Sequence, residues 1–202
     1  TSGINIRYNG PHISFNSQTS YQYIQDKMGI DQDFSPRNIF YGQNKIRQHM
    51  YCQEFTVKSV NKSRYHWITG AFVFRQTINR KVDLSRFTDT TRHLTNSGIP
   101  TQGIAFYHQS TLDLLQGLSC SVGLRYDYEH ARCDFSKVQQ PLNGNGETKS
   151  LEQFNRSLHF GQFTPRFSMQ YLSSHNQLFY ASVSKGYKAG GFNVSFLNND
   201  DY

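Results

Sequence analysis

The chain has 202 residues, a formal net charge of +7 and only 36% hydrophobic residues, yet it holds 16 Phe and 13 Tyr. A disordered chain would lack these aromatic residues, and a helical bundle would need more leucine and alanine. No apolar run approaches the roughly 18 residues of a membrane-spanning helix. Residues 1–10 lack the charged and apolar regions of a signal peptide, so we expect any targeting segment to lie upstream.

Apolar and polar residues alternate with a period of two along much of the chain. The clearest case starts at Leu118, where the even positions read Leu, Cys, Val, Leu, Tyr, Tyr and the odd positions read Ser, Ser, Gly, Arg, Asp, Glu. Similar alternation predicts eight strands, at 3–8, 13–23, 50–59, 67–77, 103–112, 118–129, 162–171 and 179–188. Lys185 interrupts the pattern in the last of them. Several of these strands exceed the usual length of about five or six residues.

The predicted connections alternate between short and long. Short turns are expected at 9–10, 61–63, 113–117 and 173–176. Long polar loops are expected at 26–46, 78–100 and 134–150, and another after Gly191. This rhythm is typical of an all-β, antiparallel, up-and-down transmembrane β-barrel, in which strands of about 9–11 residues cross the lipid between short periplasmic turns and long extracellular loops. The apolar side chains would then face lipid. A soluble β-sandwich also alternates in this way and is the alternative.

Cysteine and histidine residues give no sign of a metal site or of catalysis. Cys52, Cys120 and Cys133 are odd in number and lack CxxC spacing, so we predict no disulfide framework and no zinc site. The eight histidines are scattered and form no HExxH motif. His93 and His130 are candidates for haem iron, although a solvated loop histidine or an interfacial histidine is the expected interpretation. We expect no enzymatic activity, no cofactor and no metal.

Several segments together resemble one protein family. QEFTV at 53–57 followed by HWITGAFVFRQ at 66–76 resembles the paired strands of TonB-dependent outer-membrane receptors. VGLRYD at 122–127, TPRF at 164–167 and YASVSKGYKAGGFN at 180–193 are similar to later strands of the same barrel, and DQDF at 31–34 is similar to a loop segment. Thr56 departs from the pattern, because the family often has arginine there. The matching residues are Gln53, Glu54, Trp67, Gly70, Gly123, Arg125, Tyr126, Pro165, Arg166, Gly186, Tyr187, Lys188, Gly190, Gly191 and Phe192.

The resemblance implies the middle part of a receptor barrel, from which the plug, the TonB box and the closing strands are absent. Residues 1–202 would form a fragment of a barrel of about 22 strands. On the polar face we expect the lumen-facing candidates for ligand binding, which are Glu54, Arg125, Asp127, Glu129, Arg166 and Lys188. Basic residues in or near the connections could also steer an anionic ligand; these are Arg47, Arg64, Arg75, Arg80, Lys81, Arg86 and Arg92.

The function that the resemblance implies is active import across the outer membrane of a Gram-negative bacterium. The cargo would be a scarce nutrient such as a ferric siderophore, with haem, cobalamin or a glycan as other candidates. The expected partners are this small ligand, outer-membrane lipid and lipopolysaccharide, and TonB through regions absent from the chain. A passive porin is one alternative. A soluble basic β-sheet protein that binds nucleic acid is another, although no RNA-binding motif supports it.

Overall fold

The computed structural model describes residues 1–31, 35–60 and 63–192, which form one antiparallel sheet of eight strands paired in sequence order. Within this part of the chain there is no helix, and therefore none long and apolar enough to cross a membrane. The strands are β1 (Ser2–Asn9), β2 (Ile13–Asp31), β3 (Phe40–Ser59), β4 (Tyr65–Arg86), β5 (Thr91–Leu115), β6 (Leu118–Pro141), β7 (Lys149–Leu172) and β8 (Leu178–Ser184). The predicted all-β class and the eight strands are confirmed.

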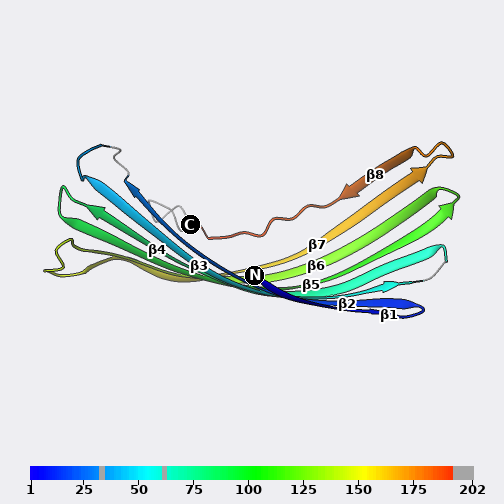
Figure 1. Ribbon diagram of the computed structural model, residues 1–202, viewed down its shortest axis with the longest axis horizontal. Helices are drawn as coiled ribbons and strands as arrows, with labels where there is room; N and C mark the ends of the chain where they lie inside the picture. Colours follow the sequence, from blue (N-terminus) through cyan, green and yellow to red (C-terminus); the bar gives the residue numbers. More distant parts are fainter. Residues whose placement is uncertain (32–34, 61–62, 193–202) are drawn as a thin grey trace.

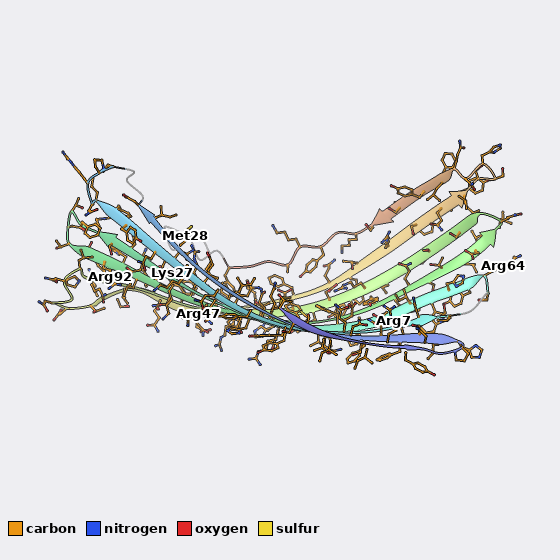
Figure 2. The ribbon with its side chains drawn as sticks, viewed as in Figure 1. Arg7, Lys27, Met28, Arg47, Arg64 and Arg92 are labelled. Carbon is orange, nitrogen blue, oxygen red and sulfur yellow. The ribbon has the colours of Figure 1, made fainter. Side chains whose placement is uncertain are left out.

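The sheet is strongly curved, with one concave and one convex face (Figure 1). Directly paired residues of neighbouring strands share a face, so the register assigns each side chain to one of the two. Figure 2 shows Met28 on the concave side and Arg47 on the convex side. All residues recorded as buried share the face of Met28, where curvature crowds the side chains; they are Ser14, Ser97, Ala105, Ser119, Ala131, Cys133 and Phe135.

An apolar band covers the convex face over the first ten or so residues of each long strand, counted from the short turns. In β6 it runs from Leu118 to Tyr128, and Val122 and Leu124 leave 57% and 51% of their surface exposed. The paired positions of β7 continue the band with large apolar side chains, namely Phe163, Phe167, Met169 and Tyr171. An apolar face this exposed is the reverse of a water-soluble sheet, whose apolar face packs into a core. It suits lipid contact.

Paired tyrosine and histidine side chains mark the end of the apolar band. In β2 and β3 the Tyr21 hydroxyl lies 3.0 Å from His49 Nδ1, and the ring of Tyr23 lies 4.9 Å from that of the same histidine. In β6 and β7 the rings of His130 and His159 stack at 4.4 Å. Amphipathic aromatic residues concentrate where the hydrocarbon of a membrane meets water. Beyond this level most outward positions are polar or charged, although Leu94 and Val138 are apolar.

The prediction of long loops at 26–46, 78–100 and 134–150 is wrong for most of their residues. The strands continue through these segments, and β2 to β7 reach 19 to 25 residues each. The connections at this end shrink to 32–39, 87–90 and 142–148. In these segments the convex positions are mostly polar, and the concave positions mix polar residues with apolar ones such as Phe135. The apolar-out alternation is lost there, so the sequence carries no strand signal although the backbone pairing continues. The long strands therefore rise well beyond the thickness of a hydrocarbon layer, which is about 30 Å.

The end of the chain also differs from the prediction. Strand β8 stops at Ser184, and residues 185–192 are irregular, so Tyr187 and Lys188 do not belong to a strand. Near the end of this segment Gly190 lies against the ring of Phe160 in β7, and a Cβ added to Gly190 would come within 2.5 Å of that ring. Residues 32–34 of the DQDF motif, turn residues 61–62, Asn193 and the chain beyond it lie outside the described residues.

Candidate functional site on the concave face

Five of the six predicted lumen-facing residues lie on the concave face. Glu54 is in β3, Arg125, Asp127 and Glu129 are in β6, and Arg166 is in β7. Their faces follow from the register, in which Glu54 is opposite Phe72, Phe72 is opposite Ala105 and Ala105 is opposite Asp127. The sixth, Lys188, lies in the irregular segment after β8 and has no place in this register.

Tyr107 of β5 links these residues into one network. Its hydroxyl donates a hydrogen bond of 2.9 Å to Glu54 Oε1 and lies 2.9 Å from the hydroxyl of Thr56. Because the Tyr107 hydroxyl donates its proton to Glu54, the Thr56 hydroxyl is the donor in its hydrogen bond with the Tyr107 oxygen. Thr56, which departs from the family pattern, therefore has a role in this protein: it orients Tyr107.

The guanidinium of Arg125 lies on the other side of this tyrosine. Its Cζ is 5.9 Å from the centre of the Tyr107 ring, and its Nε and Nη2 donate to the carboxylate of Asp127 at 2.9 and 2.7 Å. A two-point contact between arginine and carboxylate fixes the plane of both groups. Arg125 is therefore held in place by Asp127 and by the ring of Tyr107 together.

Two glycines allow aromatic rings to lie close to the concave surface. A Cβ on Gly70 would lie 2.4 Å from the ring and hydroxyl of Tyr107, and a Cβ on Gly103 would lie 2.5 Å from the ring of Phe74. Rings that cover a cross-strand glycine help to fix the register of a sheet. This gives a physical reason for the motif glycine at position 70.

A hollow of about 410 Å³ lies beside this network on the concave face, at the position of Gly123. Its walls include Ile68, Tyr107, Arg125 and Arg166. Gly123 has no side chain to fill it, and a Cβ there would meet its nearest neighbours only at 3.7 Å. Arg166 forms no ion pair with any carboxylate among the described residues, so it can bind an anionic group that enters the hollow.

The remaining predicted residues divide between the faces. Among the motif residues, the convex face holds Gln53, Trp67, Tyr126 and Pro165. Among the basic residues expected near loops, Arg47, Arg75, Lys81 and Arg92 lie on the convex face of the strands, whereas Arg80 and Arg86 lie on the concave face. Arg80, Lys81, Arg86 and Arg92 fall within the predicted loop 78–100 but lie in strands, although Arg86 and Arg92 remain beside the connection 87–90. Arg64 does lie in the connection before β4.

Tyr107 is absent from the predicted site residues, although its position in the sequence carries one signal. Tyr107 has the same parity as Gln109 and Thr111, which places it on the polar side of its strand. A tyrosine suits either face of such a strand, so its type alone did not indicate a lumenal role. The histidines proposed for haem iron lie in strands, with His93 in β5 and His130 stacked on His159 at the convex face. The described residues hold no group of three or more potential metal ligands.

A curved antiparallel sheet with an apolar convex band and a polar network on its concave face defines the wall of a membrane β-barrel. Residues 1–201 match the model of the TonB dependent receptor-like β-barrel family, and the chain belongs to this family. The family consists of transport receptors of the Gram-negative outer membrane.

Two solved structures are similar to this chain in fold. The ferric yersiniabactin uptake receptor FyuA from Yersinia pestis matches with a TM-score of 0.79 and 14% identity, over 93% of this chain and 28% of that one. The siderophore receptor PiuA from Acinetobacter baumannii matches with a TM-score of 0.67 and 12% identity, over 89% of this chain and 31% of that one. The chain therefore spans about a third or less of the length of these receptors.

Proposed function

We propose that this chain forms part of the barrel wall of an outer-membrane receptor that imports a scarce nutrient, with a ferric siderophore as the first candidate. The observation that carries the proposal is the pairing of an apolar convex band with the concave network of Glu54, Tyr107, Arg125 and Asp127 in a chain of this family. Two receptors of similar fold, the ferric yersiniabactin uptake receptor FyuA and the siderophore receptor PiuA, support the choice of cargo.

The concave hollow is suited to bind an anionic group. This group would belong to the ligand or to an inner domain that fills the barrel. Arg166 lines the hollow and has no carboxylate partner among the described residues, whereas Arg125 is already paired with Asp127. An anion in the hollow would gain a charge-assisted hydrogen bond from Arg166. Glu54, Asp127 and Glu129 add negative charge nearby, so cationic groups of the same ligand or inner domain have partners too.

We propose further that the chain is a middle segment of a longer receptor. The chain covers only 28% and 31% of the lengths of the two receptors, which supports this interpretation. A sheet of eight long strands has two open edges, β1 and β8, and an open edge in lipid costs several kcal/mol for each unpaired backbone group. Further strands would close the barrel, and an inner plug with a TonB-binding segment would couple it to energy from the inner membrane.

Uptake under iron limitation tests the function. Cells that carry the intact receptor gene and cells that lack it are compared for accumulation of iron-55 delivered on a panel of siderophores. We expect accumulation with at least one siderophore, and its loss when the gene or TonB is removed. Equal accumulation in all three strains for every siderophore would refute import of this cargo.

A passive porin is the second candidate, since a polar concave face suits it equally. The two functions differ in their need for energy. Passage that persists without TonB and depends only on solute size would favour the porin, whereas passage that stops without TonB would favour the receptor.

A further inference from the structure

The connection between β6 and β7 contains two Asn–Gly pairs in a row. It spans residues 142–148 and reads LNGNGET, so that Asn143 precedes Gly144 and Asn145 precedes Gly146. Residues 143–148 are exposed, and none of them belongs to a strand. The amide carbon of an asparagine side chain lies within reach of neighbouring backbone groups, and a following glycine has no side chain to block the approach. The chain can therefore react with itself at this tip.

The reaction open to an Asn–Gly pair is the loss of the asparagine amide, to which asparagine owes its sensitivity to heat. The backbone nitrogen of the following residue gives up its proton and forms a bond to Cγ, while the bond between Cγ and Nδ2 breaks. The amide leaves as ammonia together with that proton, and a cyclic imide remains. Water then opens the imide at either carbonyl carbon. The product is aspartate or isoaspartate, and no oxidant or reductant takes part.

The Asn145–Gly146 pair is the one with the fewest restraints. The Asn145 side chain and the Gly146 nitrogen form no hydrogen bond with any part of the chain that the structure describes. Gly146 has a φ angle of 140°, which residues with a side chain rarely adopt, and a Cβ there would come within 2.8 Å of Pro141 Cγ. The turn therefore requires glycine after Asn145, and the reactive pair is part of its geometry.

The Asn143–Gly144 pair is restrained by two long hydrogen bonds. Asn143 Oδ1 accepts a hydrogen bond of 3.2 Å from the Asn145 nitrogen, and the Gly144 nitrogen donates to the Pro141 carbonyl at 3.2 Å. A nitrogen that donates to a carbonyl must leave it before it can attack the side chain. Both distances lie at the weak end of the usual range, so this pair should react more slowly than Asn145–Gly146 without being inert.

A third Asn–Gly pair, in the turn between β1 and β2, is held firmly and serves as an internal comparison. Asn9 Oδ1 accepts a hydrogen bond of 2.8 Å from the Ser14 hydroxyl. The Gly10 nitrogen donates to the carbonyl of Ile13 at 2.9 Å. Both the carbon to be attacked and the attacking nitrogen are therefore fixed. The same dipeptide thus occurs in three states of restraint within one chain.

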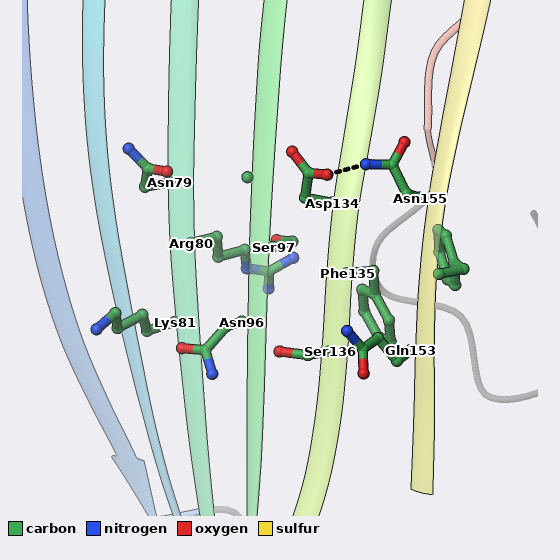
Figure 3. A pocket seen from close by; sticks show the side chains of 12 residues that line it. Asn79, Arg80, Lys81, Asn96, Ser97, Asp134, Phe135, Ser136, Gln153 and Asn155 are labelled. Carbon is green, nitrogen blue, oxygen red and sulfur yellow. Dashed lines mark hydrogen bonds between the residues drawn. The ribbon is translucent and has the colours of Figure 1, made fainter. Parts of the chain in front are cut away.

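Asparagines inside the strands are protected by the sheet itself. Figure 3 draws three of them, namely Asn79 of β4, Asn96 of β5 and Asn155 of β7. Each is followed by a residue with a side chain, and the backbone at each is paired with a neighbouring strand. The Asn155 amide also donates to Asp134 (Figure 3). These positions should keep their amides longest.

We propose that Asn145 is a modification site at which the chain converts its own asparagine to aspartate and isoaspartate. The Gly146 nitrogen bonds to Asn145 Cγ, Nδ2 leaves as ammonia, and water is the only other reactant. Each event adds a negative charge beside Glu147, because both products carry a carboxylate that is ionised at neutral pH. Isoaspartate also routes the backbone through the former side chain. The tip of the β6–β7 hairpin therefore becomes more acidic as the molecule ages.

Peptide mass spectrometry of the intact receptor in mild detergent tests the proposal. Samples taken during incubation at neutral pH are digested under acidic conditions, which stop the reaction. Loss of an amide raises the mass of a peptide by about 1 Da. Electron-transfer fragmentation assigns the gain to Asn9, Asn143 or Asn145 and separates isoaspartate from aspartate.

We expect Asn145 to lose its amide at least about tenfold faster than Asn9, because two hydrogen bonds must break before the Asn9–Gly10 pair can react. Asn143 should fall between them. The rate at Asn145 should rise with pH, since the attacking nitrogen must lose its proton, and isoaspartate should appear among the products. In receptor unfolded by urea the rates at Asn9, Asn143 and Asn145 should converge, since only the fold distinguishes the three pairs.

Variants separate the site from its neighbour. Asn145→Gln should abolish the rapid gain, because a glutamine side chain is too long to close the same ring with Gly146. Asn143→Gln is the matched control and should leave the gain at residue 145 in place. Ser14→Ala frees Asn9 Oδ1 and should speed the reaction at Asn9.

Either of two results would overturn the proposal. The first is a rate at Asn145 in the folded receptor that is no higher than the rate at Asn9. The second is a gain at Asn145 without isoaspartate, which would exclude the cyclic imide. Loss of the Asn145 amide is independent of the imported cargo, so siderophore uptake measured on the same cells tests the import function separately.

Discussion

The ring of Tyr107 lies against the backbone of Gly70, so that a Cβ added to Gly70 would lie 2.4 Å from the Cζ and the hydroxyl oxygen of the tyrosine. The same Cβ would lie 2.6 Å from the backbone oxygen of Phe55 on the neighbouring strand. The tyrosine could turn away, but the backbone oxygen belongs to the β3–β4 pairing and can move only with the strand. Glycine at position 70 therefore sets both the spacing of two strands and the position of the ring that joins Glu54 to Arg125.

Substitution of this glycine should be costly. Gly70→Ala forces a shift of Tyr107 and of the β3 backbone, and we expect the intact receptor to lose about 1–3 kcal/mol of unfolding free energy. The midpoint of urea unfolding in detergent measures this loss. Gly123→Ala is the control, since its Cβ has 3.7 Å of clearance and should leave stability unchanged or slightly raised. Equal midpoints for Gly70→Ala and the wild type would contradict the account.

Removal of the tyrosine hydroxyl should weaken the concave network. Tyr107→Phe leaves a Glu54 oxygen and the Thr56 hydroxyl without their shared partner, and we expect a loss of about 1 kcal/mol. Tyr65→Phe is the matched control, because the Tyr65 hydroxyl is hydrogen-bonded to Ser110 in an exposed position on the convex face. If both variants unfold at the same urea concentration as the wild type, the network has no role in stability.

The sequence predicts one part of each long strand better than the other. The better-predicted part lies in the apolar band, and the other part extends beyond it. Within the band, one face must be apolar and the other polar, so the alternation from Leu118 to Tyr128 indicated both strand and face. Beyond it, outward positions such as Lys81 are polar, and the concave face mixes polar residues with apolar ones such as Phe135, so the sequence carries no strand pattern there. Glu54, Arg125 and Asp127 could be placed on one face by parity. Their link through Tyr107 depends on the pairing of β3 with β4 and of β4 with β5, which no local pattern encodes.

The unpaired arginine of the concave hollow should matter for ligand binding more than for folding. Arg166→Gln should weaken binding of an anionic ferric siderophore by about tenfold or more, because it removes a charge-assisted hydrogen bond. Its unfolding midpoint should stay near the wild-type value, since Arg166 has no carboxylate partner among the described residues. Lys58→Gln, on the same face but outside the hollow, is the control. Unchanged affinity in Arg166→Gln would remove this residue from the ligand site.

The tip of the β4–β5 hairpin should open in acid. A hydrogen bond of 2.7 Å from the Thr91 hydroxyl, followed by the contact with Arg86, holds the pKa of Asp89 below its usual value of 3.8. A carboxyl with a lowered folded-state pKa stabilises the fold while ionised, and this stabilisation is lost as the pH falls through that pKa. We therefore expect full protection at neutral pH and loss below about pH 4.

Amide hydrogen exchange at residues 87–91, corrected for the intrinsic effect of pH, measures this opening. Thr91→Val removes the hydroxyl and keeps the side-chain shape, so its tip should be less protected at neutral pH and should respond less to acid. A tip that is equally protected at both pH values in the wild type would refute the role of Asp89.

The lipid-facing orientation of the convex band is the central claim, and site-directed spin labelling along β6 tests it most directly. In the intact receptor, with Cys52, Cys120 and Cys133 replaced by alanine and the protein reconstituted in liposomes, single labels are placed from residue 118 to residue 132. We predict that labels at the even positions from 118 to 128 collide with oxygen dissolved in the lipid, that labels at the odd positions collide with a water-soluble nickel complex, and that position 132 is reached by the nickel complex. Equal access of the nickel complex to positions 122, 123, 124 and 125 would contradict the account.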